Sequence, residues 1–216
     1  MSEVLPFGIV MIISLVKEAV EDYRKYTNDK KANNTKVSIF KETKFCIEKC
    51  QNIRVGNIIK IHKDELIPAD VLVIKSSLKN GLCYMQTSNL DGESQLKPRE
   101  ALLITHKEIH NKANEINNFF DYKDDHFFIE TFPPNKDIYD IKGTLFYKNN
   151  KNYFSIKNVL LRGARLKNVD YVYGIVIYNG HDTKLMQNIG NSSMKMSNID
   201  KNLNYTIIII FIFCIL

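Results

Sequence analysis

The middle of the chain alternates apolar and polar residues with the period of two that half-buried strands show. Residues Lys36 to Glu48 alternate in this way around a Lys-Glu-Thr turn, which predicts a β-hairpin. Short segments rich in β-branched, aromatic or other apolar residues predict further strands near 58–61, 71–74, 82–86, 127–132, 143–147 and 171–178. Many short strands with little helix between them predict a mainly β fold, a compact β-barrel or sandwich.

Two stretches within this region carry helical signals instead. Residues 105–118 have polar helix-forming composition, and a second, short helix is predicted at 181–188. Asp182 or Thr183 is expected to cap that second helix, since both side chains can accept hydrogen bonds from free backbone N–H groups.

The two ends of the chain differ from its middle. Residues 4–16 are apolar and uncharged but shorter than the roughly 20 residues of a complete membrane span. They continue without a break into residues 17–31, which contain helix formers and a Glu21–Lys25 pair at helical spacing. Residues 205–216 are almost wholly apolar. We interpret both ends as partial transmembrane α-helices of an integral membrane protein.

Composition narrows the classes of function. The chain has 216 residues, is 44% hydrophobic and carries a net charge of +6, which is typical of a folded domain and not of a disordered chain. Its lysines are scattered, so we predict no nucleic-acid partner. The four cysteines follow no zinc or disulfide spacing, and we expect reduced thiols and no metal site.

The strongest candidate for chemistry is the loop Asp91-Gly92-Glu93-Ser94, which follows the strand predicted at 82–86. Asp-Gly alone indicates only a tight turn. A turn does not explain the glutamate, so the loop needs a wider context before it indicates a function.

Other candidates are weaker. His106 and His110 have the i, i+4 spacing of metal ligands, but no third ligand matches them, so we expect both to face solvent. His181 is expected to cap or pack near the short helix. Arg162 and Arg165 could contact phosphate or a neighbouring domain, or lie at an ordinary exposed strand end.

Three blocks of sequence, in order, provide that context. Their most specific strings are Pro68-Ala69-Asp70, residues 89–93 (Asn-Leu-Asp-Gly-Glu) and residues 180–186 (Gly-His-Asp-Thr-Lys-Leu-Met). Together they resemble the actuator domain of P-type ATPases, and more narrowly that of the type IV, phospholipid-translocating members, or flippases. Residues 17–29 resemble the end of the family's second membrane helix, and residues 198–212 the start of its third.

The resemblance covers nearly the whole chain except residues 107–137 and the segment near Asn149. It implies three parts: residues 1–31, the end of a transmembrane helix and its extension; residues 32–200, a distorted β-barrel or jelly-roll-like actuator domain in the cytosol; and residues 201–216, the start of the next transmembrane helix. Flippases most often have threonine at the position of Ser94, where many ion pumps have serine.

The resemblance also assigns roles to the loop. Glu93 would hold and deprotonate the water that hydrolyses an aspartyl phosphate on another domain. Gly92, without a side chain, would let the backbone approach the acyl phosphate. Asp91 and Ser94 would shape the turn and hold Glu93 by hydrogen bonds.

The remaining machinery is implied outside this chain, which contains no Asp-Lys-Thr-Gly phosphorylation string. Implied partners are the parent's phosphorylation and nucleotide-binding domains, a phospholipid substrate and an accessory glycoprotein subunit, with ATP and Mg²⁺ as cofactors bound elsewhere. The chain alone is therefore predicted to be inactive. Two alternatives stay open: an ion-transporting P-type ATPase, and the flippase-like regulatory module of a guanylyl cyclase fusion.

Overall fold

The structure is a computed structural model that describes residues 4–41, 44–88, 92–111, 127–147 and 150–189, together with Tyr205 and Ile209. The chain divides into two compact units. One comprises residues 1–32 and 191–216, and the other runs from Asn33 to Gly190.

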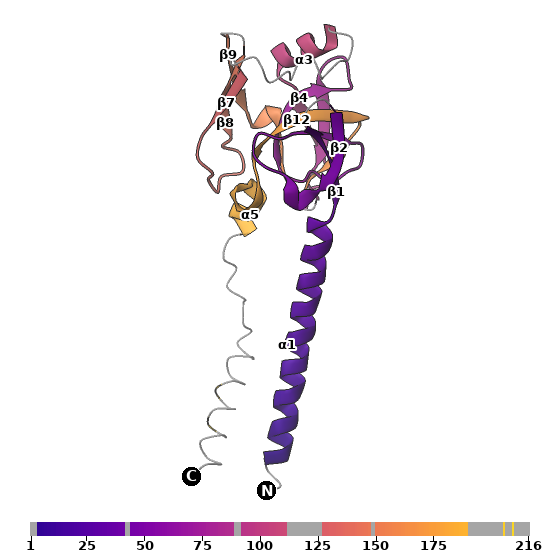
Figure 1. Ribbon diagram of the computed structural model, residues 1–216. Coiled ribbons are helices and arrows are strands. Elements are labelled where there is room, and N and C mark those ends of the chain that lie inside the picture. Colours follow the sequence, from indigo (N-terminus) through magenta and orange to yellow (C-terminus); the bar gives the residue numbers. More distant parts are fainter. Residues whose placement is uncertain are drawn as a thin grey trace. The chain divides into compact units, whose positions relative to one another are not determined.

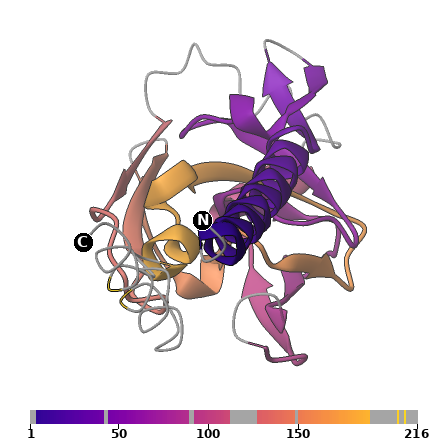
Figure 2. The same ribbon diagram turned by 90° about the horizontal axis from the view of Figure 1, so that it is seen from below.

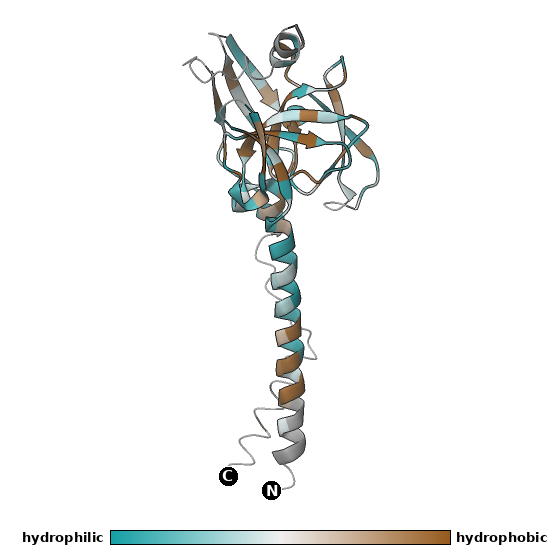
Figure 3. Cartoon of the chain, turned by 45° about the vertical axis from the view of Figure 1, so that its right-hand side comes forward, coloured by the Kyte–Doolittle hydropathy of each residue, from teal (hydrophilic) through white to brown (hydrophobic). Residues whose placement is uncertain are grey.

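The first unit contains α1, a single α-helix over Val4–Asn33. Its hydropathy changes along its length: brown, hydrophobic residues lie toward the N-terminal end and teal, hydrophilic ones toward the C-terminal end (Figure 3). The predicted continuation of the apolar run into a polar helix is therefore confirmed. Within the described residues, no helix combines the length and the apolar content that a membrane crossing requires. The apolar run at 205–216 lies outside the described residues except at two positions.

The second unit is built mainly of strands, as the alternating pattern predicts. Its strands are β1 (Lys36–Lys41), β2 (Lys44–Lys49), β3 (Ile58–His62), β4 (Asp70–Ser76), β5 (Leu82–Gln86), β6 (Leu96–Glu100), β7 (Phe127–Thr131), β8 (Lys142–Tyr147), β9 (Asn150–Ser155), β10 (Val159–Leu160), β11 (Arg165–Lys167) and β12 (Tyr171–Tyr178). Its helices are η1 (Cys50–Asn52), α3 (Leu103–Asn111), η2 (Ile156–Asn158), η3 (Gly180–Asp182) and α5 (Lys184–Ile189).

These strands form three antiparallel sheets (Figure 1). The largest has the order β10-β4-β12-β3-β1-β2, and the smaller ones have the orders β11-β5-β6 and β7-β8-β9. Viewed from below, β12 is the long curved strand in orange (Figure 2). The predicted hairpin pairs as expected, with Phe40 opposite Phe45. The mainly β fold is thereby confirmed.

The core lies where β12 enters between β3 and β4. Every residue of β4 is buried, which explains its nearly continuous apolar sequence. Gly174 of β12 lies at a shift in register against β4. A Cβ atom there would stand 2.3 Å from Cγ1 of Val71 and 2.7 Å from the carbonyl oxygen of Leu72. Glycine at 174 therefore allows the two central strands to approach.

The sequence did not predict β6. Its residues are mostly polar and include Pro98, which lacks the N–H that a central strand needs. Strand β6 is an edge strand paired only with β5, where Pro98 stands opposite Tyr84. An edge strand needs its hydrogen-bonding groups on one side only, so this proline is tolerated.

The two predicted helices are present with changes. In the described residues the first is α3, which begins two residues earlier than predicted, at Leu103, while residues 112–118 lie outside the described part. The prediction that His106 faces solvent is wrong: its side chain is 5% exposed, and Nε2 lies 3.1 Å from the carbonyl oxygen of Lys79. An imidazole has enough apolar surface to pack when a carbonyl satisfies its polar edge. The side chain of His110 is outside the described part.

Candidate functional site

The hairpin β5–β6 presents the predicted loop. Its last strand pair is Gln86 with Leu96, so residues 87–95 connect the two strands. Residues 89–91, including the predicted Asp91, lie outside the described residues. Of the predicted four-residue loop 91–94, the structure describes Gly92, Glu93 and Ser94, all of them exposed.

Gly92 adopts a φ of +76°, in the left-handed region that L side chains disfavour. No atom would lie within 4 Å of a Cβ placed there. The backbone conformation, and not local crowding, therefore calls for glycine, and the space beside this residue is open.

Glu93 holds its carboxylate toward Lys97 of β6. Oε2 of Glu93 lies 3.0 Å from Nζ of Lys97, whose side chain is 23% exposed while that of Glu93 is 58% exposed. No sequence pattern predicts the involvement of Lys97. Four-residue spacing brings side chains together on a helix, but this segment turns from a loop into a strand, so the spacing gave no signal. An exposed carboxylate with one cationic neighbour can accept a proton from a group that docks against the loop.

A second polar centre lies at Asp70, which is fully buried at the start of β4. One of its oxygens accepts the backbone N–H of Arg162 at 2.8 Å, and the other accepts that of Lys184 at 2.7 Å. Burial raises the pKa of the Asp70 carboxyl, and these two N–H groups act against that rise. Asp70 thus ties the turn at Arg162 and the first residue of α5 to the central sheet.

Thr183 occupies the N-cap position of α5, as predicted, since its carbonyl oxygen accepts the N–H of Gln187 at 3.0 Å. Its hydroxyl has another role than expected: it donates to the carbonyl oxygen of Gly180 at 2.8 Å, and the N–H of Lys184 is bound by Asp70. A carboxylate distant in sequence therefore supplies the capping side chain, which local sequence patterns cannot reveal. His181 is exposed in η3, where its carbonyl oxygen accepts a hydrogen bond from the side chain of Gln187.

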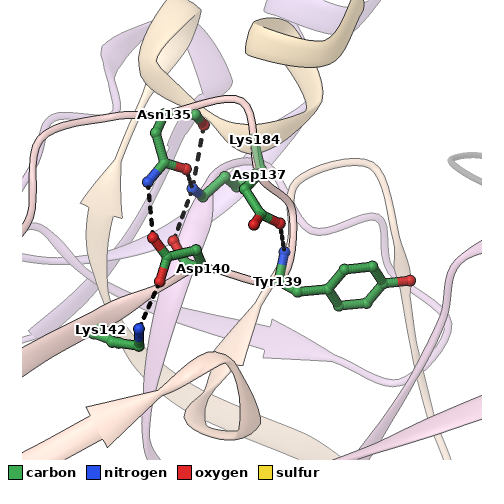
Figure 4. A network of polar contacts seen from close by, with 6 residues as sticks. All are labelled: Asn135, Asp137, Tyr139, Asp140, Lys142 and Lys184. Carbon is green, nitrogen blue, oxygen red and sulfur yellow. Dashed lines mark hydrogen bonds and ion pairs between the residues drawn. The ribbon is translucent and has the colours of Figure 1, made fainter.

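The side chain of Lys184 is buried and anchors the segment between β7 and β8 (Figure 4). Its ammonium donates to the carbonyl oxygens of Asn135, at 3.2 Å, and of Asp140, at 3.1 Å, and also to the Asn135 side chain. Burial lowers the pKa of this ammonium, and Asp140 is the foremost of the carboxylates that oppose the shift. Asp140 in turn pairs with Lys142 at 3.0 Å.

The two arginines left open by the sequence make contacts within the unit. Nη1 of Arg162 donates to the carbonyl oxygen of Gly180 at 2.9 Å. Nη1 of Arg165 donates to the carbonyl oxygen of Asp64 at 3.0 Å, from an exposed position on β11. Both arginines therefore support the local fold. Arg165 lies on an exposed strand, as expected if these arginines mark an ordinary strand end.

Asp70 thus joins two of the motifs that carried the resemblance. Pro68-Ala69-Asp70 and the string 180–186 are far apart in sequence, and in the structure Asp70 bonds directly to the backbone of Lys184. The third motif, at 89–93, belongs to the β5–β6 hairpin and is described only at Gly92 and Glu93.

Comparison with known proteins identifies relatives over nearly the whole chain. It is 36% identical over 211 residues to "Probable phospholipid-transporting ATPase 11" of Arabidopsis thaliana, covering 97% of this chain and 17% of the relative. It is 38% identical over 212 residues to "Phospholipid-transporting ATPase IC" of Mus musculus, covering 98% of this chain and 16% of the relative. No family model matches the chain. A solved zinc-transporting PIB-type ATPase in an E2.Pi state aligns with a TM-score of 0.41 at 10% identity, over 79% of this chain and 19% of that one, which is too distant to assign a fold.

These relatives are P-type ATPases, and the resemblance expected from the sequence is confirmed at that level. More narrowly, the chain is homologous to a segment of the phospholipid-transporting, type IV members, at 36–38% identity. The chain spans 16–17% of the length of these curated relatives.

Proposed function

We propose that this chain is part of an ATP-driven phospholipid flippase and that residues 32–200 form its actuator domain, a distorted β-barrel on the cytosolic side of the membrane. The observation that carries the proposal is 36–38% identity to phospholipid-transporting ATPases over 97–98% of the chain. The relatives' names favour lipid transport over the ion pump that Ser94 leaves open.

In this proposal, Glu93 acts on a phosphoaspartate of another domain. Its carboxylate is exposed at the end of a hairpin and forms an ion pair with Lys97 on strand β6. Such a group can orient an attacking water and accept its proton, which is general-base catalysis. Gly92, with open space where a Cβ would be, lets the backbone come close to the phosphoryl group. Asp91 and Ser94 shape this turn.

The proposal places ATP and Mg²⁺ elsewhere in the parent protein. Among the described residues, no group of three or more His, Cys, Asp or Glu side chains is arranged to hold a metal ion. In the parent, the phosphorylation and nucleotide-binding domains are the partners of the loop, a phospholipid is the substrate, and an accessory glycoprotein subunit completes the assembly. Residues 1–31 form the end of one transmembrane helix and its cytosolic extension, and residues 201–216 form the start of the next transmembrane helix.

The experiment is transport by the full-length parent protein in phospholipid vesicles. We expect ATP-dependent movement of a fluorescent phospholipid between leaflets and ATP hydrolysis that added phospholipid stimulates. Hydrolysis stimulated by a monovalent or divalent cation, with no lipid movement, would support the ion-pump alternative. A cyclase domain in the parent, with neither activity, would support the regulatory module of a guanylyl cyclase fusion.

A further inference from the structure

A pocket of about 190 Å³ opens between the β5–β6 hairpin, η2 and α5. Its apolar wall comes from segments that are distant in sequence, namely Met85, Ile138, Ile156, Leu161 and Leu185. An engineered apolar cavity of roughly 150 Å³ can hold benzene, so this one has room for a body the size of one aromatic ring.

The charges around the pocket have one sign. Lys97, Arg99 and Lys184 line it, and none of its described lining residues is Asp or Glu. The ammonium of Lys184 is directed to the 132–141 segment, where its hydrogen bonds are made. Lys97 forms an ion pair with Glu93, which is not a lining residue. Because Lys184 and Lys97 are directed to these partners, Arg99 is the principal cation available to a bound molecule.

The contacts of Arg99 are made with the backbone. Nε donates to the carbonyl oxygen of Val159 at 3.0 Å, and Nη1 donates to that of Pro98 at 2.8 Å. Within the described part of the chain, no carboxylate pairs with this half-buried guanidinium. A guanidinium has five N–H donors, so several remain for a ligand. Burial lowers the pKa of Arg99.

A cation held in an apolar pocket without a counter-ion is costly, and an anion that enters recovers this energy. The carbonyls of Val159 and Pro98 fix the plane of the guanidinium, which suits bidentate contact with a carboxylate or phosphate. We propose that this pocket binds a small organic anion, with a carboxylate or phosphate on Arg99 and a ring-sized apolar body against the partly exposed Ile156 and Leu185. This site shares Lys97 with the proposed catalytic loop, but binding of the anion does not require the proposed function.

The test measures binding of benzoate, phenyl phosphate and the uncharged benzyl alcohol to the 216-residue chain. Binding is detected by calorimetry and by chemical-shift changes of the lining methyl groups in NMR spectra. At least one anion should bind, and benzyl alcohol should bind about tenfold more weakly, because it lacks the charge-assisted hydrogen bonds. If neither anion binds at about 10 mM, the assignment is overturned. Binding of a short acidic peptide with neither small anion would equally overturn a small-molecule site.

Matched variants locate the binding. Arg99→Met should weaken the anion about tenfold or more, whereas Arg165→Met, which removes an exposed arginine that also bonds a backbone carbonyl, should leave it unchanged. Equal affinity in the two variants contradicts the proposal. Should Arg99→Met fail to fold by circular dichroism, Ile156→Phe decides, since it fills the apolar wall and keeps the guanidinium. Loss of binding in Ile156→Phe supports the pocket, and retained binding refutes it.

Discussion

Asp70 is a buried carboxylate whose two oxygens each accept one backbone N–H, from Arg162 and from Lys184. Both donors would otherwise be left without partners, one at a turn and one at the start of a helix. Desolvation opposes the charge and raises the pKa of Asp70, so the two bonds have to offset the energy of burying it. Removing the carboxylate leaves both N–H groups buried and unsatisfied.

Asp70→Ala should therefore lower the free energy of unfolding by about 3 kcal/mol, because it deletes a fully buried carboxylate that accepts two hydrogen bonds. Urea unfolding followed by circular dichroism measures it. Asp170→Ala, at an exposed position, is the matched control and should leave the midpoint unchanged. Equal unfolding midpoints for the two variants would show that the hydrogen bonds of Asp70 make no net contribution to stability.

Cys83 provides a second test at this scale. Its side chain is fully buried, and burial raises the pKa of its thiol to about 12. Because the thiolate is the reactive form, iodoacetamide at about pH 8 should alkylate native Cys83 slower than the partly exposed Cys46, by a factor on the order of 10³. Peptide mass spectrometry separates the two sites, and urea should remove the difference. Similar native rates would place Cys83 outside the core.

At the residue scale, sequence reveals functional residues that are neighbours along the chain, but not those that only the fold brings together. Gly92 and Glu93 can be recognised from the sequence because they are adjacent in one motif. Both are exposed, as a loop that docks against another domain requires. The catalytic role of the loop stays a prediction, and Asp91 lies outside the described residues. Lys97 and the pairing of Asp70 with Lys184 depend on tertiary contacts, which no local pattern reports.

At the scale of elements, β12 is positioned by a residue without a side chain. Gly174 faces Val71 and the backbone of Leu72 at distances too short for a Cβ. Neither atom can move freely, since one belongs to a buried side chain and the other to the backbone of a central strand. Close packing of β4 against β12 thus depends on this glycine.

Gly174→Ala should destabilise the sheet by about 1–3 kcal/mol through overpacking, and should speed amide hydrogen exchange in β4 and β12. Gly8→Ala in α1, where nothing lies within 4 Å of the new Cβ, is the control and should leave that exchange unchanged. Unaltered exchange in Gly174→Ala would show that the strands can separate at no cost.

The strands that sequence predicted share a strong local signal. β3, β4, β5 and β12 are apolar or alternate, and β5 was predicted with its exact limits. Strands β6, β9, β10 and β11 were not predicted. Of these, β6 is polar and contains Pro98, so only its pairing with β5 makes it a strand. The buried position of His106 likewise arises from the contact between α3 and the turn at Lys79, which is set by the tertiary fold.

At the scale of the whole molecule, the chain is a segment homologous to 16–17% of much longer phospholipid-transporting ATPases. It carries an exposed carboxylate on a hairpin, whereas the groups that this carboxylate would act on are proposed to lie in other domains of the parent. We therefore propose that Glu93 completes an active site whose other half belongs to those domains.

The most direct measurement is decay of the phosphoenzyme in the full-length parent carrying Glu93→Gln. Glutamine keeps the size of the side chain and cannot accept the proton, so labelled ATP should still form the phosphoenzyme. After a chase with unlabelled ATP, decay of the acid-stable phosphoprotein should slow by a factor on the order of 10²–10⁴. Glu100→Gln, an exposed glutamate on the same hairpin, should decay as the wild type does. Decay of Glu93→Gln at the wild-type rate would contradict the account and leave the loop as an ordinary turn.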